Sequence, residues 1–259
     1  MLKVVKIGGN VVDNPEKLTS FLEDFAALEG PKVLVHGGGK IATTISKALG
    51  IETQMIEGRR VTDAQTLDVV TMVYAGLVNK KIVARLQGLR VNAFGLCGAD
   101  GSLMPSLKRI PNPIDFGYVG DPIVERFSVS TAQMLIDSGY TLVVAPITHA
   151  GTGMLLNTNA DTVAQTVAVA LSGVYEVELV YCFEKKGVLS DINDEYSVIP
   201  RITLPEYELL KKSGVVVAGM IPKLDNAFKA IASGVKSVVI CGSDAIAAPG
   251  YGGTKLVGE

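Results

Sequence analysis

Short apolar runs alternate with amphipathic segments along most of this chain. β-Branched runs at 2–7, 32–36, 91–96, 141–146, 178–181 and 237–240 predict buried strands. Apolar residues at helical spacing predict helices at 41–49, 130–137, 161–171 and 222–232. Two more helices are expected where a capping residue precedes the pattern, at Asn14-Pro15 and at Thr62-Asp63. The stretch 101–126, rich in Gly and Pro, predicts loops and short hairpins.

This alternation predicts an α/β fold with an open, mostly parallel central sheet covered by helices on both faces. An approximate boundary near Gly173, where a predicted helix ends, divides the chain into 1–173 and 174–259. Ligands of such sheets bind at the carboxyl ends of the strands. The glycines that follow the first two predicted strands therefore indicate a binding site.

The segment Lys6-Ile7-Gly8-Gly9 carries the most chemistry. Glycines at a strand end let the backbone approach a ligand, and their N–H groups can surround phosphate oxygens. Lys6 adds a positive charge at the same place. Neither a Gly-x-x-x-x-Gly-Lys-Ser/Thr string nor a Gly-x-Gly-x-x-Gly string occurs. The segment predicts a phosphate site of another kind, with an ordinary strand-to-loop turn as the alternative.

Composition narrows the class of protein. The chain has 259 residues, of which 48% are hydrophobic, so it can bury a large core. A net charge of −2 without a basic run argues against nucleic-acid binding, and no apolar run is long enough to span a membrane. Cys97, Cys182 and Cys241 lack metal-ligand spacing and are expected to be buried thiols. These features predict a cytoplasmic protein.

Five segments follow one another along the chain: Lys6-Ile7-Gly8-Gly9, His36-Gly37-Gly38-Gly39, Gly58-Arg59-Arg60-Val61-Thr62, Asn157-Thr158-Asn159-Ala160-Asp161 and Gly219-Met220-Ile221-Pro222-Lys223. Together they resemble the amino acid kinase family over nearly the whole chain, and within it the acylglutamate branch. The resemblance implies a three-layer α/β/α fold. It also implies that residues 1–173 form an acylglutamate-binding and dimerisation lobe and residues 174–259 a nucleotide-binding lobe.

The activity implied by the resemblance is ATP-dependent phosphorylation of the γ-carboxylate of N-acetyl-L-glutamate, giving N-acetylglutamyl 5-phosphate in arginine biosynthesis. Such a carboxylate has a reference pKa of about 4.3 and needs no general base. Accordingly, neither of the two histidines lies in a base constellation, and His36 is expected to be a packed strand-end residue. Magnesium is expected to be held mainly by the ATP phosphates, with no protein ligands assigned.

The resemblance also implies residue roles. Lys6 and Lys223 would stabilise charge on the transferring phosphoryl group, and Asp161 would hold the two lysines in place. Arg60 would bind the substrate α-carboxylate and Asn157 would add amide hydrogen bonds. The glycine and nucleotide contacts fall into three groups: Gly8, Gly9 and Gly38 for phosphate, Gly38 and Gly39 for the acylglutamate, and Gly187, Val188, Leu189, Gly219 and Met220 for the nucleotide.

Several of these residues also have a simpler structural interpretation. Lys6 fits a solvated strand end, Asp161 a helix N-cap, and Asn157 a turn. Arg60, next to Arg59, fits a surface charge pair. Lys223 could merely follow a helix start.

The chain departs from the family in one segment. A Thr/Ser-Asp-Val-x-Gly-Val loop is usual, whereas residues 181–189 here read Tyr-Cys-Phe-Glu-Lys-Lys-Gly-Val-Leu, without the aspartate. A non-catalytic nucleotide sensor is therefore an alternative function, with Lys185 or Lys186 as possible phosphate contacts. A dinucleotide-dependent oxidoreductase is another alternative, although the expected glycine motif is missing.

The acyl group and the assembly are also left open. N-Succinylglutamate is an alternative acceptor, for which Lys40 and Arg59 are candidate partners of the additional carboxylate. The chain starts at its first predicted strand, whereas arginine-inhibited hexameric relatives carry a preceding helix. We therefore expect a homodimer that arginine does not inhibit.

Overall fold

A computed structural model describes residues 1–56, 58–183, 186–191, 193–216 and 220–258. Its strands are β1 (Leu2–Ile7), β2 (Lys32–His36), β3 (Met55–Ile56), β4 (Arg59–Arg60), β5 (Ala93–Cys97), β6 (Ser106–Lys108), β7 (Gly120–Pro122), β8 (Thr141–Ala145), β9 (Ile147–His149), β10 (Leu155–Asn157), β11 (Val177–Phe183), β12 (Arg201–Thr203), β13 (Ser237–Gly242) and β14 (Thr254–Val257). Its α-helices are α1 (Gly9–Val12), α2 (Pro15–Ala27), α3 (Gly39–Ala48), α4 (Ala64–Thr71), α5 (Asn79–Gly88), α6 (Val129–Asp137), α7 (Ala160–Leu171), α8 (Leu204–Lys212) and α9 (Ile221–Ala232).

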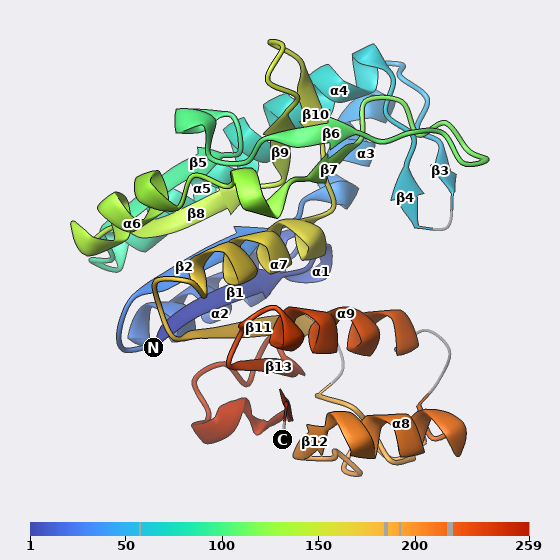
Figure 1. The fold of residues 1–259 in the computed structure, drawn as a ribbon. Helices are drawn as coiled ribbons and strands as arrows, with labels where there is room; N and C mark the ends of the chain where they lie inside the picture. The colour runs from blue at the N-terminus through green and yellow to red at the C-terminus, as the bar shows by residue number, and fades with distance from the viewer. Residues whose placement is uncertain (57, 184–185, 192, 217–219, 259) are drawn as a thin grey trace.

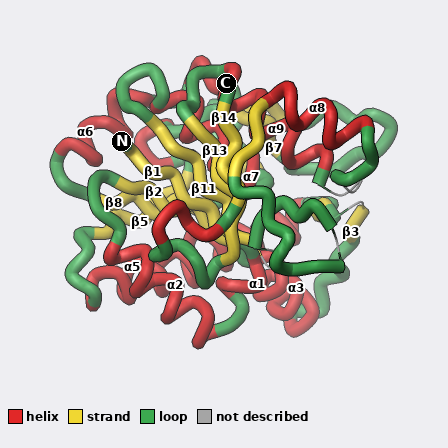
Figure 2. Tube along the Cα trace, turned by 90° about the horizontal axis from the view of Figure 1, so that it is seen from below, coloured by secondary structure: helices red, strands yellow, loops and turns green. Residues whose placement is uncertain are grey.

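One eight-stranded sheet organises the molecule, in the order β12-β14-β13-β11-β1-β2-β8-β5. All neighbouring strands are parallel except β13 and β14. Figure 1 shows the sheet running from β5 and β8 at the top to β12 at the bottom, and Figure 2 shows helices on both sides of it. Three two-stranded sheets, β3–β4, β6–β7 and β9–β10, lie outside the main sheet. The predicted open, mostly parallel sheet is confirmed.

Alternation along β1 divides its side chains between two cores. Leu2 and Val4 pack into the core that contains the buried side of α7 and α9. Val5 and Ile7 pack into the core formed with α2, α4 and α5. Because successive strand residues point to opposite faces, Lys6 lies on the same face as Leu2 and Val4. The pattern places the lysine beneath α7.

Most predicted strands and helices are confirmed, with boundaries shifted by at most two residues. Helix α2 begins as expected: Asn14 caps it by accepting hydrogen bonds from the amides of Glu16 and Lys17, and Pro15 is its first residue. Helix α4 is capped by Asp63. It is followed by a π-helix over Met72–Val78 and then by α5, a continuation that the sequence pattern did not predict.

The sequence interpretation missed α8, β12 and β14. A signal for α8 is present, because Thr203 and Glu206 form a capping box at its start. Strand β14 is short and pairs antiparallel with β13, which a rule based on parallel sheets does not anticipate. None of the described helices is both long and apolar enough to cross a bilayer.

Candidate active site

A cleft of about 1130 Å³ opens at the carboxyl ends of the central strands. The glycine loops after β1 and β2 line it, together with the first turns of α3, α7 and α9. Strand carboxyl ends and helix amino termini meet at this edge, as expected for a parallel sheet. Of the site residues predicted from the sequence, the cleft is lined by Gly8, Gly9, Gly38, Gly39, Arg60, Asn157, Asp161, Met220 and Lys223.

Lys6 reaches this cleft through an ion pair with Asp161. Its Nζ lies 2.7 Å from Asp161 Oδ1, and only 9% of the Lys6 side chain is exposed, against 40% for Asp161. The pair forms because Lys6 is the last residue of β1 on the α7 face and Asp161 lies in the first turn of α7. A solvated strand-end lysine is therefore the wrong description.

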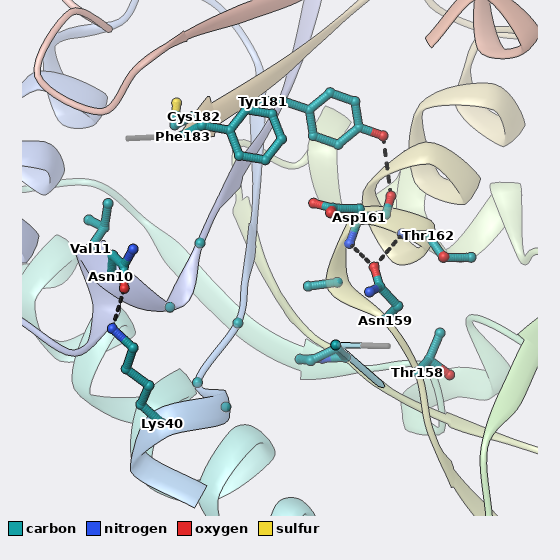
Figure 3. Close-up of a pocket in the computed structure, with 18 of the residues that line it drawn as sticks. Asn10, Val11, Lys40, Thr158, Asn159, Asp161, Thr162, Tyr181, Cys182 and Phe183 are labelled. Carbon is teal, nitrogen blue, oxygen red and sulfur yellow. Dashed lines mark hydrogen bonds between the residues drawn. The ribbon is translucent and has the colours of Figure 1, made fainter. Parts of the chain in front are cut away.

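The N-cap of α7 is Asn159 rather than Asp161. The Asn159 side chain accepts hydrogen bonds from the amides of Asp161 at 2.8 Å and Thr162 at 3.3 Å. Figure 3 shows these bonds, with the Asp161 carboxylate pointing away from them. Because Asn159 caps the helix, the Asp161 side chain is available to Lys6, and the N-cap alternative for Asp161 is wrong.

Lys223 lies near the start of α9 and faces the same carboxylate. Burial lowers its pKa, the charge of Asp161 opposes that change, and repulsion from Lys6 adds to it. Both ammonium groups also lie over the Phe183 ring, with Nζ of Lys223 3.9 Å and Nζ of Lys6 5.3 Å from its centroid. Both ammonium groups thus lie near one aromatic ring, and Asp161 pairs with Lys6 and acts electrostatically on Lys223, so the three predicted catalytic side chains lie close together.

Phe183 is a site residue that the sequence interpretation missed. It ends β11 on the same face as Tyr181, whose ring stacks on it at 5.9 Å. Tyr181 is paired in register with Lys6 across the sheet. Strand alternation predicts that positions 181 and 183 share a face, but the pairing of Tyr181 with Lys6 depends on sheet register, which the sequence does not specify.

The two glycine loops are tied to each other. Gly37 donates its N–H to the Ile7 carbonyl oxygen at 3.2 Å, and the Lys40 ammonium donates to the Asn10 side chain, as Figure 3 shows. A Cβ at Gly38 would lie 3.2 Å from the Tyr74 ring, so glycine is required there. The loops therefore present their backbone to the cleft without intervening side chains.

Arg60 is buried, with 7% of the residue exposed, whereas Arg59 is exposed. Its Nη2 donates to the Gly39 carbonyl oxygen and to Thr43 Oγ1, both at 2.8 Å, and its Nη1 lies 3.3 Å from Thr53 Oγ1. The two arginines alternate along β4, so only one of them points inward. A surface charge pair does not describe Arg60.

Asn157 is connected to Arg60 through Thr62. The Asn157 side-chain amide donates to Thr62 Oγ1 at 3.0 Å, and that hydroxyl donates to the Arg60 carbonyl oxygen at 3.2 Å. Thr62 is fully buried and Asn157 is 9% exposed. Asn157 ends β10 at the cleft, so the arginine and the amide lie on one rigid wall.

The residues predicted to bind the nucleotide do not all line the cleft. Met220 lines the cleft, and Gly219 lies outside the described residues, as do Glu184 and Lys185. The segment 187–189 packs instead against β14, where the Val188 amide donates to Thr254 Oγ1 at 2.8 Å. Lys186 lies over the Tyr196 ring, with its Nζ 4.6 Å from the centroid.

Ser243 and Asp244 also line the cleft and were not predicted. They directly follow β13, the neighbour of β11, and the Ser243 amide donates to the Phe183 carbonyl oxygen at 3.2 Å. The general rule that ligands meet strand carboxyl ends would have identified them had β13 been extended to its observed end.

The described part of the chain contains no group of three or more His, Cys, Asp or Glu side chains placed to hold a metal ion. Asp161, the carboxylate between the two lysines, is paired with Lys6.

Comparison with known proteins agrees with the fold. Residues 1–242 match the model of the amino acid kinase family. An acetylglutamate kinase of Cytophaga hutchinsonii is 58% identical over 246 residues, covering 95% of this chain and 92% of that protein. An acetylglutamate kinase of Bacteroides thetaiotaomicron is 56% identical over 245 residues, covering 95% of each chain.

Solved structures share the fold. The smu.665 protein of Streptococcus mutans has a TM-score of 0.78 at 26% identity, covering 100% of this chain and 99% of that one. A Giardia lamblia carbamate kinase bound to AMP-PNP has a TM-score of 0.71 at 15% identity, covering 100% of this chain and 98% of that one. With a family match over most of its length and relatives above half identity, this chain belongs to the amino acid kinase family.

Proposed function

We propose that this protein transfers the γ-phosphoryl group of ATP to the γ-carboxylate of N-acetyl-L-glutamate, giving N-acetylglutamyl 5-phosphate and ADP for arginine biosynthesis. The observation that carries the proposal is the pairing of Lys6 with Asp161 at 2.7 Å, with Lys223 over the same Phe183 ring, in a cleft that also holds a buried arginine. The similarity to two acetylglutamate kinases supports the choice of acceptor.

The chemistry requires positioning and charge stabilisation. An ionised carboxylate oxygen attacks the γ-phosphorus, the new carboxylate–phosphorus bond forms, and the bond to the β,γ-bridging oxygen breaks to release ADP. Lys6 and Lys223 neutralise negative charge on the phosphoryl oxygens during the transfer. The amides of Gly8, Gly9 and Gly38 donate hydrogen bonds to the same oxygens. Asp161 reduces the repulsion between the two ammonium groups, which keeps both at the reacting centre.

The acceptor is oriented by the other wall of the cleft. Arg60 binds the α-carboxylate of the acylglutamate, and Asn157 hydrogen-bonds the same part of the molecule. Gly38 and Gly39 admit the acyl-amino group to the backbone. Because the arginine is already held by Gly39 and Thr43, little reorganisation is needed when the acceptor binds.

We assign magnesium to the ATP phosphates. Mg²⁺ retains several water ligands and commonly binds through substrate phosphates rather than through a protein cage. Asp161 is already engaged by Lys6, which fits a metal held mainly by the nucleotide. When bound, the ion would neutralise phosphate charge alongside the lysines.

An ATP-dependent hydroxylamine trap tests this function, because hydroxylamine converts an acyl phosphate to a hydroxamate. Hydroxamate formed with N-acetylglutamate and MgATP, and lost without either, supports the proposal. ATP binding without hydroxamate from any acidic amino acid would contradict it and favour a nucleotide sensor. Binding of a nicotinamide cofactor would favour the oxidoreductase instead.

N-Succinyl-L-glutamate is the second candidate acceptor. The two cations that sequence interpretation assigned to its additional carboxylate, Lys40 and Arg59, both line the cleft. The same trap run with both acceptors decides between them by the ratio of kcat/KM. A large preference for the succinyl compound would replace the acetyl assignment and leave the phosphoryl chemistry unchanged.

The homodimer also belongs to this proposal. Strand β5 is one edge of the sheet, and exposed apolar side chains lie on it and on neighbouring elements, among them Phe94 in β5 and Met72 and Leu77 in the adjoining π-helix. An apolar sheet edge of this kind favours pairing with a second copy. Light scattering that gives a monomer or a hexamer, or strong inhibition by arginine, would contradict the expected assembly.

The proposal also includes the two lobes and a cytoplasmic location. Residues 1–173 carry the acceptor groups and residues 174–259 carry Lys223 and the nucleotide side, with one sheet running through both. Cys182 and Cys241 are buried with their sulfur atoms 3.8 Å apart and unbonded, which fits a reducing cytoplasm.

A further inference from the structure

The peptide between Gly37 and Gly38 is held from inside the protein by His36. This side chain is fully buried at the end of β2, and its Nδ1 lies 2.8 Å from the Gly37 carbonyl oxygen. A carbonyl oxygen only accepts hydrogen bonds, so the imidazole carries its proton on Nδ1 and leaves Nε2 as an acceptor.

Asn79, the first residue of α5, contacts the other nitrogen of the His36 ring. Its amide nitrogen donates to His36 Nε2 at 3.1 Å and to the Val143 carbonyl oxygen at 2.9 Å. Its oxygen accepts from the Lys80 ammonium at 3.1 Å. Since Val143 O only accepts and the ammonium only donates, the amide orientation is fixed, and every polar side-chain atom of His36 and Asn79 has a partner.

The imidazole is neutral in this setting. Burial lowers the pKa of His36 to about 4, helped by the nearby Lys80 charge and opposed by the hydrogen bond to Gly37. A neutral ring is the form that can donate from Nδ1 and accept at Nε2 simultaneously, so the network is complete near pH 7.

The orientation of the Gly37–Gly38 peptide links the hydrogen bonds of His36 and Asn79 to the cleft. The Gly37–Gly38 peptide is trans, so its carbonyl and its N–H point in opposite directions. Holding the carbonyl toward buried His36 turns the Gly38 N–H away from the interior. Both glycines line the cleft, and within the described ranges the backbone hydrogen bonds of turns and loops include none donated by Gly38.

We propose that His36 and Asn79 are positioning residues that aim the Gly38 amide at the phosphoryl group in transit. They touch neither substrate; they act by fixing one peptide plane. The inference rests on the proposed function, because that function assigns the Gly38 amide to phosphate. If the Gly38 N–H points elsewhere, the energy of the transition state should rise more than that of the bound substrates. The reason is that charge on the phosphoryl oxygens is being redistributed in the transition state.

The kinetic test uses His36→Phe, Asn79→Leu and the double variant. We expect His36→Phe to lower kcat about 10- to 100-fold while the KM for N-acetylglutamate changes less than about 3-fold. The double variant should be no slower than the slower single variant, because both residues serve one contact. His36→Asn, which can place an N–H near the position of Nδ1, should recover much of the loss.

A matched control is His149→Asn, since His149 is the other histidine and lies on β9 outside the cleft. It should retain the kcat of the parent protein. Wild-type kcat in His36→Phe, or no advantage of His36→Asn over His36→Phe, would overturn the proposal. A loss confined to thermal stability would do the same.

A second measurement does not depend on turnover. In ¹⁵N–¹H spectra, the Gly38 amide signal should move when the magnesium complex of a non-hydrolysable ATP analogue is added, and this movement should be lost in His36→Phe. An unmoved wild-type signal would overturn the proposal even in an active enzyme. A signal that moves in the wild type but not in His36→Phe, in a protein that forms no hydroxamate, would leave the positioning role supported and the kinase assignment wrong.

Discussion

Arg60 and Lys223 each bring a positive charge to the same cleft, but the fold holds them differently. The guanidinium of Arg60 is buried and bonded to Gly39 and Thr43. Among the described residues, Lys223 forms no salt bridge, and its ammonium lies over the Phe183 ring. On the proposed function, the acceptor wall is therefore fixed by hydrogen bonds within the protein, whereas the transfer side keeps an ammonium that no salt bridge among the described residues holds.

This difference suits the two ends of the reaction. A carboxylate that only needs to be held is well served by a preset planar fork. A phosphoryl group that moves between oxygens is better served by ammonium groups that can follow it, with one carboxylate and one aromatic ring limiting their repulsion. The comparison predicts that variants on the two sides affect different kinetic constants.

The largest effect is expected from Lys6→Ala. Removing a charge that acts on the transferring phosphoryl group should lower kcat about 1,000-fold, with the KM for N-acetylglutamate nearly unchanged. Steady-state hydroxamate formation measures both constants. Lys3→Ala, at the other end of β1, is the control and should leave kcat unchanged. A Lys6 variant that keeps most of its kcat would remove the distinction between the two sides.

Arg60→Lys should act on the acceptor. A lysine keeps the charge but cannot offer two parallel N–H groups, so we expect the KM for N-acetylglutamate to rise about 10- to 100-fold with little change in kcat. Arg126→Lys, an exposed site outside the cleft, serves as the control. If kcat falls and KM does not, the arginine acts in transfer, and the fixed-wall interpretation is wrong.

Phe183→Leu tests the aromatic support of the two lysines. Loss of a partly desolvated cation–π contact should lower kcat/KM for MgATP about 3- to 30-fold. Phe183→Tyr keeps the ring and should stay within about 2-fold of the parent. Equal losses in both variants would assign the effect to packing rather than to the ring face.

The smallest expected effect is a shift of the alkaline limb of the pH profile of kcat/KM to lower pH. Because the pKa of Lys223 is lowered, mainly by burial, its charge is lost at a lower pH than that of an ordinary lysine, and kcat/KM should fall as the pH rises through that value. Lys223→Arg, which stays charged, should remove this limb even if its overall rate is lower. An alkaline limb identical in the two proteins would exclude Lys223 as its source.

Much of this comparison could be read from the sequence because its residues follow regular elements. Lys6 ends a β-branched strand, Asp161 begins an amphipathic helix, and Lys223 follows Pro222 at another helix start. Parallel-sheet geometry then brings these termini to one edge. The family resemblance supplied the roles, which stay predictions, and the structure shows Lys6 and Asp161 in an ion pair.

Contacts between distant segments could not be read in the same way. The approach of two lysines to Phe183 depends on sheet register, and the Asn79 contact with His36 depends on how α5 packs against β5 and β8. A buried Asn in a helix pattern looks like a surface residue until its partners are known. Local sequence patterns cannot specify partners that are 43 residues apart.

The most direct test is a paired measurement on Lys6→Ala and Arg60→Lys. Calorimetry would give the Kd for N-acetylglutamate, and rapid-quench single turnover at saturating MgATP and acceptor would give the rate of acyl phosphate formation. The account predicts a slow transfer rate with a normal Kd for Lys6→Ala, and a weakened Kd with a near-normal rate for Arg60→Lys. If both variants change the same quantity, the division of the cleft into a fixed acceptor wall and a mobile transfer side is contradicted.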